Sequence, residues 1–149
     1  MTGSVRPAQP GDMAALIRLC GDHARYERAG YDSGGHGERL SAALFGRTPR
    51  ALAWIAELDG ETVGYASGAV EFSTWTARDF FHLDCLYLDA PARGAGLGSA
   101  LLQEAADAAR RCGLDTLQWW TPGWNETASR FYEAQGAQAT KRLRYTLVL

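Results

Sequence analysis

The sequence predicts a single α/β domain over residues 1–149, in which helices cover the faces of a mixed β-sheet. Three observations predict it. The length of 149 residues fits one domain with one core. Strand-like and helix-like segments follow one another in the order β-α-α-β-β-β-α-β-α-β. Hydrophobic residues make up 46% of the chain, which is ample for a buried core.

The N-terminal half of the chain predicts a strand, two helices and a hairpin. The segment SVRPA at residues 4–8 is typical of a short strand. Asp12 can then cap a helix, and a glycine-rich loop leads to a shorter helix over Arg39–Phe45. Two strands follow and meet at Asp59-Gly60, a dipeptide typical of tight hairpin turns. Helical periodicity places these residues on one face of the first helix: Leu16, Leu19, Cys20 and His23.

The C-terminal half predicts a long strand, two helices and two further strands. The apolar stretch at residues 79–89 is the long strand. An alanine-rich helix over 98–113 and a short strand over 114–120 come next. A second helix over 125–136 follows, and residues 137–149 close the chain as a strand. The alanine-rich helix has one inward face: Leu101, Ala105, Ala108 and Cys112.

Charge and composition exclude several classes of partner. The net charge of -2 gives no case for nucleic acid, and no apolar run is long enough to span a bilayer. The stretch MTGSVRPAQPGDM lacks the apolar region of a secretory signal, so we expect a cytoplasmic protein.

The cysteines are odd in number and widely spaced, which predicts buried thiols in a reducing compartment: Cys20, Cys85 and Cys112. No metal-ligand spacing joins them to a histidine, so we expect no metal site; the histidines are His23, His36 and His82.

The stretch ARGAGLGSALL at residues 92–102 alternates three glycines behind one arginine at the start of a predicted helix. Glycines let the backbone approach a ligand closely, and the first turn of a helix offers unpaired N–H groups and partial positive charge. Together they predict an anion site, most often for phosphate. Ser99 stands where a dinucleotide fingerprint needs its last glycine, and no Gly-Lys-Ser/Thr follows as in a P-loop. The alternative is a flexible turn that merely starts a helix.

Two motifs in this half resemble the GNAT acetyltransferase superfamily. The pattern Arg93-x-x-Gly96-x-Gly98 resembles its acyl-CoA signature. The stretch WNETASRFYEAQGA resembles its second motif, with these residues at the family's spacing: Asn125, Phe131, Tyr132 and Gly136. The resemblance implies the GNAT acyl-CoA N-acyltransferase fold, a mixed, mostly antiparallel central sheet flanked by helices.

Within the superfamily, the chain is most similar to the spermidine/spermine and thialysine acetyltransferases. Residues 6–27 follow that group's Arg-Pro-Ala start, its aspartate at Asp12 and its Tyr26-Glu27 pair. The chain departs from the group at Asp84-Cys85, where Glu-Asp is common. The resemblance implies direct transfer of an acetyl group from acetyl-CoA to a primary amine of a small molecule, such as a polyamine or a thialysine- or lysine-like compound. It also implies a homodimer, which the apolar C-terminal stretch YTLVL favours because such a strand needs an edge partner.

On the donor side, backbone N–H groups from Arg93 to Ser99 suit the CoA pyrophosphate, with the Arg93 side chain assisting. The resemblance implies that Leu86 and Leu88 pair with the pantetheine arm, and that the Leu86 N–H polarises the thioester carbonyl. Asn125 resembles a residue that hydrogen-bonds near the pantetheine, or it simply caps a helix. The expected donor-binding set is Leu86, Leu88, Arg93, Gly94, Ala95, Gly96, Leu97, Gly98, Ser99, Asn125, Ser129 and Tyr132.

Two residues are the candidates for proton transfer. The phenol of Tyr132 can protonate the leaving thiolate. Alternatively, Tyr132 is a half-buried aromatic residue with a packing role alone. Asp84 occupies the position of the group's strand glutamate and can act as base through water, or it forms a salt bridge with a nearby arginine. Strand alternation turns Leu83 and Cys85 to the face opposite Asp84. His82 shares the Asp84 face and could assist as a base, although a lone strand histidine is more often structural.

The acceptor pocket of a cationic amine needs carboxylates and an aromatic face. The expected acceptor-binding residues are Tyr26, Glu27, Trp75 and Asp84, with Glu71 and Asp79 as further candidates. Each of these acids could instead be an ordinary solvated surface group. Trp119 and Trp120 are adjacent on a strand, so they face opposite sides, one toward the core.

Three other functions remain open from the sequence alone. The same site could acetylate protein or peptide amines, with residues 31–37 forming a wider cleft. The chain could be a catalytically silent module that senses CoA. It could also bind a nucleotide phosphate without any CoA chemistry.

Overall fold

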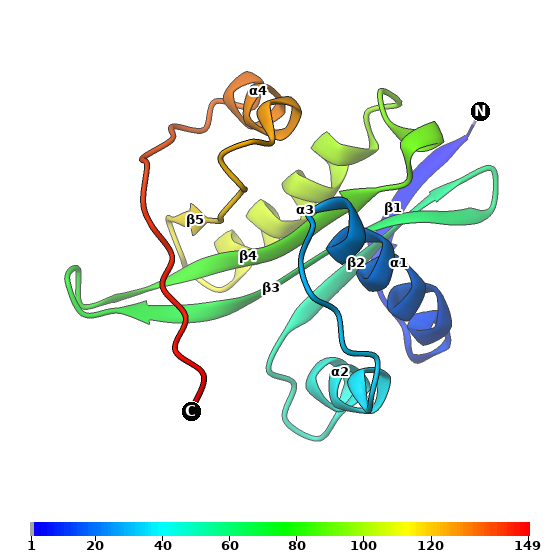
Figure 1. The fold of residues 1–149 in the computed structure, drawn as a ribbon, viewed down its shortest axis with the longest axis horizontal. Helices are drawn as coiled ribbons and strands as arrows, with labels where there is room; N and C mark the ends of the chain where they lie inside the picture. Colours follow the sequence, from blue (N-terminus) through cyan, green and yellow to red (C-terminus); the bar gives the residue numbers. More distant parts are fainter. Residues whose placement is uncertain (1) are drawn as a thin grey trace.

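The computed structural model describes residues 2–149 and contains one five-stranded sheet in the order β1-β2-β3-β4-β5. Neighbouring strands are antiparallel from β1 to β4, and β5 is parallel to β4. Helices α1 and α2 cover one face of the sheet and α3 covers the other (Figure 1). The predicted fold class is therefore confirmed. The elements are β1 Gly3–Pro7, α1 Met13–Tyr26, α2 His36–Phe45, β2 Leu52–Leu58, β3 Glu61–Ser73, β4 Arg78–Leu88, α3 Leu97–Arg111, β5 Leu117–Gln118 and α4 Glu126–Ala134, with short 3-10 turns at Pro10–Asp12 and Ala90–Ala92.

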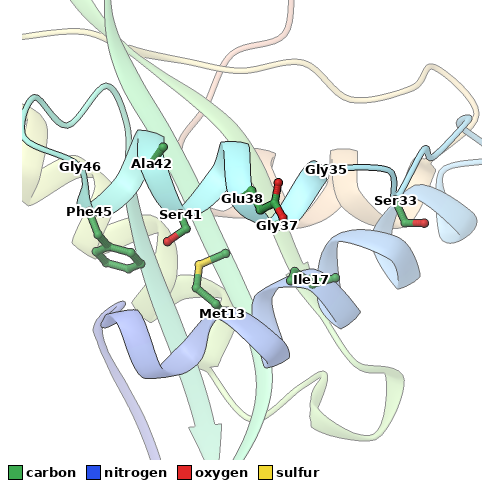
Figure 2. A pocket seen from close by; sticks show the side chains of 10 residues that line it. All are labelled: Met13, Ile17, Ser33, Gly35, Gly37, Glu38, Ser41, Ala42, Phe45 and Gly46. Carbon is green, nitrogen blue, oxygen red and sulfur yellow. The ribbon is translucent and has the colours of Figure 1, made fainter.

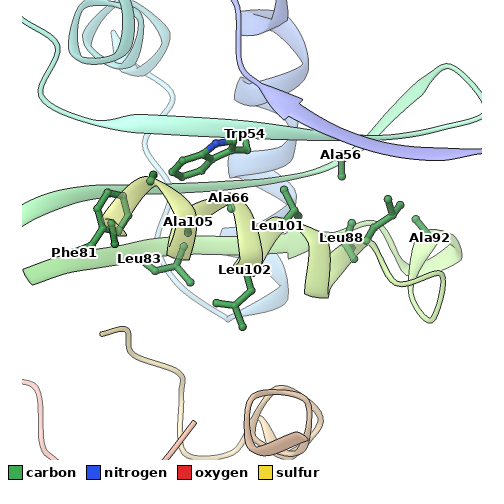
Figure 3. Close-up of a cluster of buried hydrophobic side chains, with 13 residues drawn as sticks. Trp54, Ala56, Ala66, Phe81, Leu83, Leu88, Ala92, Leu101, Leu102 and Ala105 are labelled. Atoms are coloured by element: carbon green, nitrogen blue, oxygen red, sulfur yellow. The ribbon is translucent and has the colours of Figure 1, made fainter. Parts of the chain in front are cut away.

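Two apolar cores lie on the two faces of the sheet. The larger core packs α3 against strands β2 to β4, with Trp54, Phe81 and Leu101 at its centre (Figure 3). The smaller core packs Leu16 and Leu19 of α1 and Leu44 of α2 against the opposite face. Burial of these side chains is the main stabilising term of the fold.

Asp12 lies at the N-cap position of α1, as predicted, but its carboxylate does not cap the helix. It accepts hydrogen bonds from the Arg6 guanidinium at 2.8 and 2.9 Å and from the Gln9 N–H at 2.7 Å. The Arg6 guanidinium, which also contacts Glu57, holds the pKa of Asp12 below its usual range. This carboxylate therefore joins β1 to the start of α1.

The hairpin between β2 and β3 confirms the prediction from its two turn residues. Asp59 and Gly60 both have positive φ, +51° and +85°, as a type I′ turn requires. The next helix, α2, begins at His36, three residues before the predicted start, with Gly35 in the left-handed region at its N-cap. Strand β5 contains only two residues, because the chain leaves the sheet after Gln118.

The predicted C-terminal strand is absent from the sheet. Residues 137–149 form no regular secondary structure and run from α4 past the β3–β4 hairpin (Figure 1). A strand requires a hydrogen-bonded partner, and within residues 2–149 this segment has none. Its apolar side chains are accordingly between 81% and 110% exposed: Leu143, Tyr145, Leu147, Val148 and Leu149.

The cysteine prediction is only partly right. Cys20 and Cys85 are half-buried free thiols, whereas Cys112 is exposed because it follows the last turn of α3. Trp119 and Trp120 do face opposite sides, since Trp119 packs on the larger core and Trp120 is exposed. No helix in the described part of the chain has the length and apolar character needed to cross a membrane.

Candidate active site

Strands β4 and β5 diverge and leave part of β4 without a neighbour. They pair only at Phe81 with Leu117 and His82 with Gln118. Beyond His82, β4 continues to Leu88 with no strand beside it on that side within residues 2–149. The predicted pantetheine-binding residues, Leu86 and Leu88, lie on this stretch. An unpaired strand edge offers N–H and C=O groups to an extended ligand.

A β-bulge interrupts β4 at Asp84. The ladder pairs Ser67 with Cys85 and Gly68 with Leu83, so Asp84 has no partner on β3. The extra residue reverses the alternation of side chains. Leu83 therefore packs in the α3 core, while Cys85 packs on the α1 side. The prediction that Leu83 and Cys85 share one face is wrong for this reason.

The Asp84 side chain is 72% exposed, so its charge is solvated. Among the described residues, the basic side chain that contacts it is His82, whose Nε2 is 3.7 Å from Oδ1, rather than an arginine. The Cys85 Sγ lies 3.7 Å from Asp84 Oδ2. A carboxylate held by so few partners is free to accept a proton from a water molecule.

The predicted glycine loop joins the end of β4 to α3. Gly94 and Gly96 have φ values of +82° and +81°, and Gly96 is the N-cap of α3. An added Cβ at either position would meet no atom within 4 Å, so the space beside the loop is open. The first turn of α3 presents its N–H groups to that space. This geometry suits an anion.

The side chain of Arg93 turns back toward the sheet. Its Nε donates to the Leu88 carbonyl at 3.0 Å, and its guanidinium lies 4.7 Å from the centre of the Tyr26 ring and 5.8 Å from that of Tyr87. The arginine thus links the end of β4 to α1. Its remaining N–H groups carry positive charge beside the loop.

Helix α4 begins at Asn125, whose buried side chain accepts a hydrogen bond from the Ala128 N–H at 3.2 Å. The capping prediction for Asn125 is confirmed. Ser129 Oγ donates to the Asn125 carbonyl at 3.2 Å. Phe131 faces Gly98 so closely that an added Cβ there would lie 3.2 Å from its ring. The glycine at 98 therefore lets α4 approach the start of α3.

Tyr132 lies on α4, where its ring packs 4.9 Å from that of Trp119 and 5.2 Å from that of Phe131. The pKa of Tyr132 is raised to about 12, chiefly by burial and in smaller part by the nearby charge of Glu27. The phenol therefore keeps its proton at neutral pH. The end of α1 lies beside the start of α4, since the ring centres of Tyr26 and Trp124 are 6.2 Å apart and the Arg28 guanidinium lies 4.2 Å from the centre of the Trp124 ring.

The predicted acceptor residues separate into two groups. Tyr26 and Glu27 end α1 beside this site, with Tyr26 packed on Arg93 and Tyr87. Trp75 lies at the tip of the β3–β4 hairpin, is 87% exposed and contacts Arg142. The further candidates Glu71 and Asp79 also flank that distant tip. The structure brings Tyr26 and Glu27 to the start of α4, the helix of Tyr132, and it places Asp84 on the unpaired stretch of β4. It does not bring Trp75, Glu71 or Asp79 there.

A hollow of about 770 Å³ lies elsewhere, between α1 and α2 (Figure 2). Apolar side chains of Met13, Ile17 and Phe45 line it, and Glu38 supplies its one acidic group. Neither Tyr132 nor the glycine loop contributes to it. The loop that borders it is held by the Tyr31 hydroxyl, which is 2.9 Å from His36 Nδ1. Among residues 2–149, no three metal-ligating side chains gather to hold an ion.

The sequence patterns did not predict a series of three polar side chains that contact one another beside the site. His23 Nδ1 is 3.1 Å from the Tyr65 hydroxyl, and His23 Nε2 is 3.2 Å from Glu27 Oε1. The spacing of His23 and Glu27, four residues on a helix, is the signal that could have predicted their contact. Tyr65 is distant in sequence from His23 and Glu27, so no local pattern indicates that it contacts His23.

Residues 16–137, which include the glycine loop, β4 and α4, match the acetyltransferase (GNAT) family. The chain belongs to the GNAT acetyltransferase family. It is an N-acetyltransferase, and acetyl-CoA is the acyl donor of this family.

Named relatives of this GNAT acetyltransferase act on amines. The thialysine N-epsilon-acetyltransferase of Bos taurus is 32% identical over 142 residues, covering 90% of this chain and 83% of the relative. The L-ornithine N5-acetyltransferase of Arabidopsis thaliana is 29% identical over 86 residues, covering 58% of this chain and 38% of the relative. A possible acetyltransferase from Clostridium difficile 630 shares the fold, with a TM-score of 0.81 at 15% identity and coverage of 100% of this chain and 99% of that one.

The glycine loop of the acetyltransferase gives a testable prediction. Alanine at Gly96 must adopt a φ of +81°, which costs about 1–2 kcal/mol and favours a relaxed loop with misaligned N–H groups. We expect Gly96→Ala to weaken acetyl-CoA binding about tenfold, as measured by calorimetry. Gly113→Ala is the matched control, since Gly113 has a φ of +75°, equally open surroundings and a place beyond the other end of α3. Equal affinities of the two variants would contradict the loop assignment.

Proposed function

We propose that this acetyltransferase moves the acetyl group of acetyl-CoA directly to a primary amine of a small cationic molecule, of the polyamine or thialysine/lysine-like class. The observation that carries the proposal is the setting of Tyr132. Its phenol keeps its proton at neutral pH, and its ring packs on Trp119, which directly follows β5, the short strand beside β4. Glu27 ends α1 beside the start of the helix that carries Tyr132. The names of the thialysine and ornithine relatives support the acceptor class.

The donor would lie along β4 with its pyrophosphate at the start of α3. Backbone N–H groups between Arg93 and Ser99 suit the phosphates. The unpaired stretch of β4 at Leu86 and Leu88 suits the amide groups of the pantetheine arm, and an N–H there can polarise the thioester carbonyl. Asn125, Ser129 and Tyr132 on α4 face this arm in the proposal. No metal is needed for these steps.

The chemistry requires a neutral amine and a protonated leaving group. A free alkylammonium has a pKa near ~10.4, so only about one molecule in a thousand is neutral at pH 7. Asp84 takes the ammonium proton through a water molecule. The amine nitrogen then attacks the thioester carbon, and the C–S bond breaks as the C–N bond forms. The nitrogen of the new amide releases its extra proton to solvent, and the thiolate takes the proton of Tyr132, which solvent restores.

The first experiment is thiol release from acetyl-CoA across an amine panel with a control that lacks acceptor. The panel contains spermidine, spermine, thialysine, lysine, ornithine, an aminoglycoside and a lysine peptide. We expect release with one class of small cationic amine. Release with the peptide alone would establish the protein-acetylating alternative. Acetyl-CoA binding without release for any amine would favour a CoA-sensing module, and stabilisation by ATP or NAD but not CoA would favour a nucleotide binder.

We also propose a homodimer formed through residues 138–149. The segment exposes apolar side chains and has no strand partner within the described chain. Burial of these side chains against a second copy would be favourable. We expect light scattering at micromolar concentration to give twice the chain mass of 16.2 kDa. Leu147→Glu should shift the protein toward the monomer, and a monomeric wild type would contradict the proposal.

The free thiols support a location of the protein in the reducing cytoplasm. Cys20, Cys85 and Cys112 are all unpaired in the structure, and Cys112 is exposed. An exposed thiol suits a compartment that keeps cysteines reduced.

A further inference from the structure

The linked polar side chains of Tyr65, His23 and Glu27 lie between the smaller core and the proposed acceptor site. Tyr65 is 2% exposed and His23 is 9% exposed, whereas the Glu27 side chain is 30% exposed. Burying an imidazole is costly unless its ring nitrogens find partners. Both do here, at 3.1 and 3.2 Å. The Tyr87 ring stacks on the imidazole at 5.2 Å and fixes its plane.

The surroundings of Tyr65 determine which nitrogen of His23 carries the proton. Burial raises the pKa of Tyr65 far above its usual range, so its hydroxyl is a donor. The groups around this hydroxyl are His23 Nδ1 and the thiols of Cys20 and Cys85. Burial also raises the pKa of both thiols, that of Cys85 to about 12, so both are neutral and accept hydrogen bonds weakly. The phenol proton therefore goes to Nδ1.

The other nitrogen must then carry a proton that points at Glu27. With Nδ1 accepting from Tyr65, Nε2–H donates to Glu27 Oε1. The opposite tautomer would place an imidazole lone pair against an ionised carboxylate. The groups that face His23 are Cys20 and Glu27 from its own helix, Tyr65 from β3, and Cys85 and Tyr87 from β4. None of them offers Nε2 a better acceptor than Glu27.

We propose that His23 is a positioning residue for the acceptor amine: Tyr65 fixes its tautomer, and its Nε2–H holds the Glu27 carboxylate in place at the end of α1, beside the start of α4. This proposal rests on the acetyltransferase function above, in which Glu27 binds the cationic acceptor. One oxygen of Glu27 is occupied by His23, which leaves the other for the ammonium group. The sheet core thereby sets the direction of a carboxylate that would otherwise be a mobile side chain at a helix end.

The kinetic test is a double-mutant cycle between His23 and Glu27, with KM for the amine and KM for acetyl-CoA measured separately. We expect His23→Leu to raise the KM for the amine about tenfold and to leave the KM for acetyl-CoA unchanged. His23→Gln should recover most of the loss, because its amide can still donate to Glu27. In a Glu27→Gln background, His23→Leu should have little further effect on the KM for the amine.

The chain offers a matched control in a second tyrosine–histidine pair. The Tyr31 hydroxyl is 2.9 Å from His36 Nδ1 on the surface, away from Glu27. His36→Leu should leave both KM values unchanged. Additive effects of His23→Leu and Glu27→Gln, or equal changes in the two KM values, would overturn the positioning role and leave His23 a structural residue.

A spectroscopic measurement tests the proposal without relying on turnover. Long-range proton–nitrogen NMR correlations distinguish the two tautomers of a histidine, and the His23 signals are assigned by their loss in His23→Gln. We expect the Nε2–H form in the wild type, a mixture in Tyr65→Phe, and a shifted Nε2 signal in Glu27→Gln. An Nδ1–H form in the wild type would overturn the proposal. Absence of turnover with every amine, together with the Nε2–H form and the Glu27-dependent shift, would instead refute only the acetyl-transfer function and leave the His23–Glu27 link standing.

Discussion

Replacing Tyr132 by phenylalanine is expected to lower the turnover number for acetyl transfer by about 10- to 1000-fold. The substitution removes one oxygen and its proton, while the ring can still pack on Trp119 and Phe131. Without the phenol, the CoA thiolate must leave as an anion or take its proton from water. The proton is available in the wild type because burial raises the pKa of Tyr132 to about 12.

The effect of Tyr132→Phe should be confined to the chemical step. Acetyl-CoA affinity by calorimetry and the melting temperature should stay close to the wild-type values. The wild-type turnover number should also show no loss from ionisation of this phenol up to about pH 10, since its protonated form persists there. Turnover close to wild type in the phenylalanine variant would remove Tyr132 from the mechanism.

Asp84→Asn is expected to lower turnover at neutral pH about 100-fold. Asparagine keeps the size of the side chain and the bulge, but it cannot take a proton. The loss should shrink as the pH rises toward about 10, because an increasing share of the amine is then neutral without help from a base. Steady-state rates of both proteins across this pH range, at saturating acetyl-CoA, measure the change.

His82→Gln is the comparison for the Asp84 variant. His82 Nε2 lies 3.7 Å from Asp84, so either group could pass the proton to solvent. We expect the glutamine variant to retain most of its turnover. A larger loss in His82→Gln than in Asp84→Asn would transfer the base role to the histidine. A pH-independent loss in Asp84→Asn would show that the carboxylate supports binding rather than proton removal.

Features fixed by neighbouring residues could be predicted from the sequence. The turn at Asp59-Gly60 follows from two residues that tolerate positive φ, and the start of α4 follows from the short polar side chain of Asn125. The glycine loop was predictable because Gly94 and Gly96 need φ values that other residues avoid. Tyr132 was predictable only by its motif, since a tyrosine on a helix is otherwise an ordinary packing residue.

Features that depend on contacts distant in sequence could not be predicted. The bulge at Asp84 arises from the register between β3 and β4, and it turned Cys85 to the face opposite the predicted one. The carboxylate of Asp12 binds Arg6 rather than its own helix, because folding places β1 beside it. Residues 137–149 have a strand-like composition, but composition does not supply the partner that a strand needs.

The order of the strands in the sheet has a consequence for the newly made chain. A ribosome releases the protein from its N-terminus, and each strand from β1 to β4 pairs with the next one synthesised. The glycine loop and α3 follow directly after β4, whereas β5 joins the sheet only after the crossover through α3. The helix with Tyr132 is the last element to be made. During synthesis, the glycine loop proposed to bind the donor phosphates is therefore made before the helix that carries Tyr132, the proposed acid.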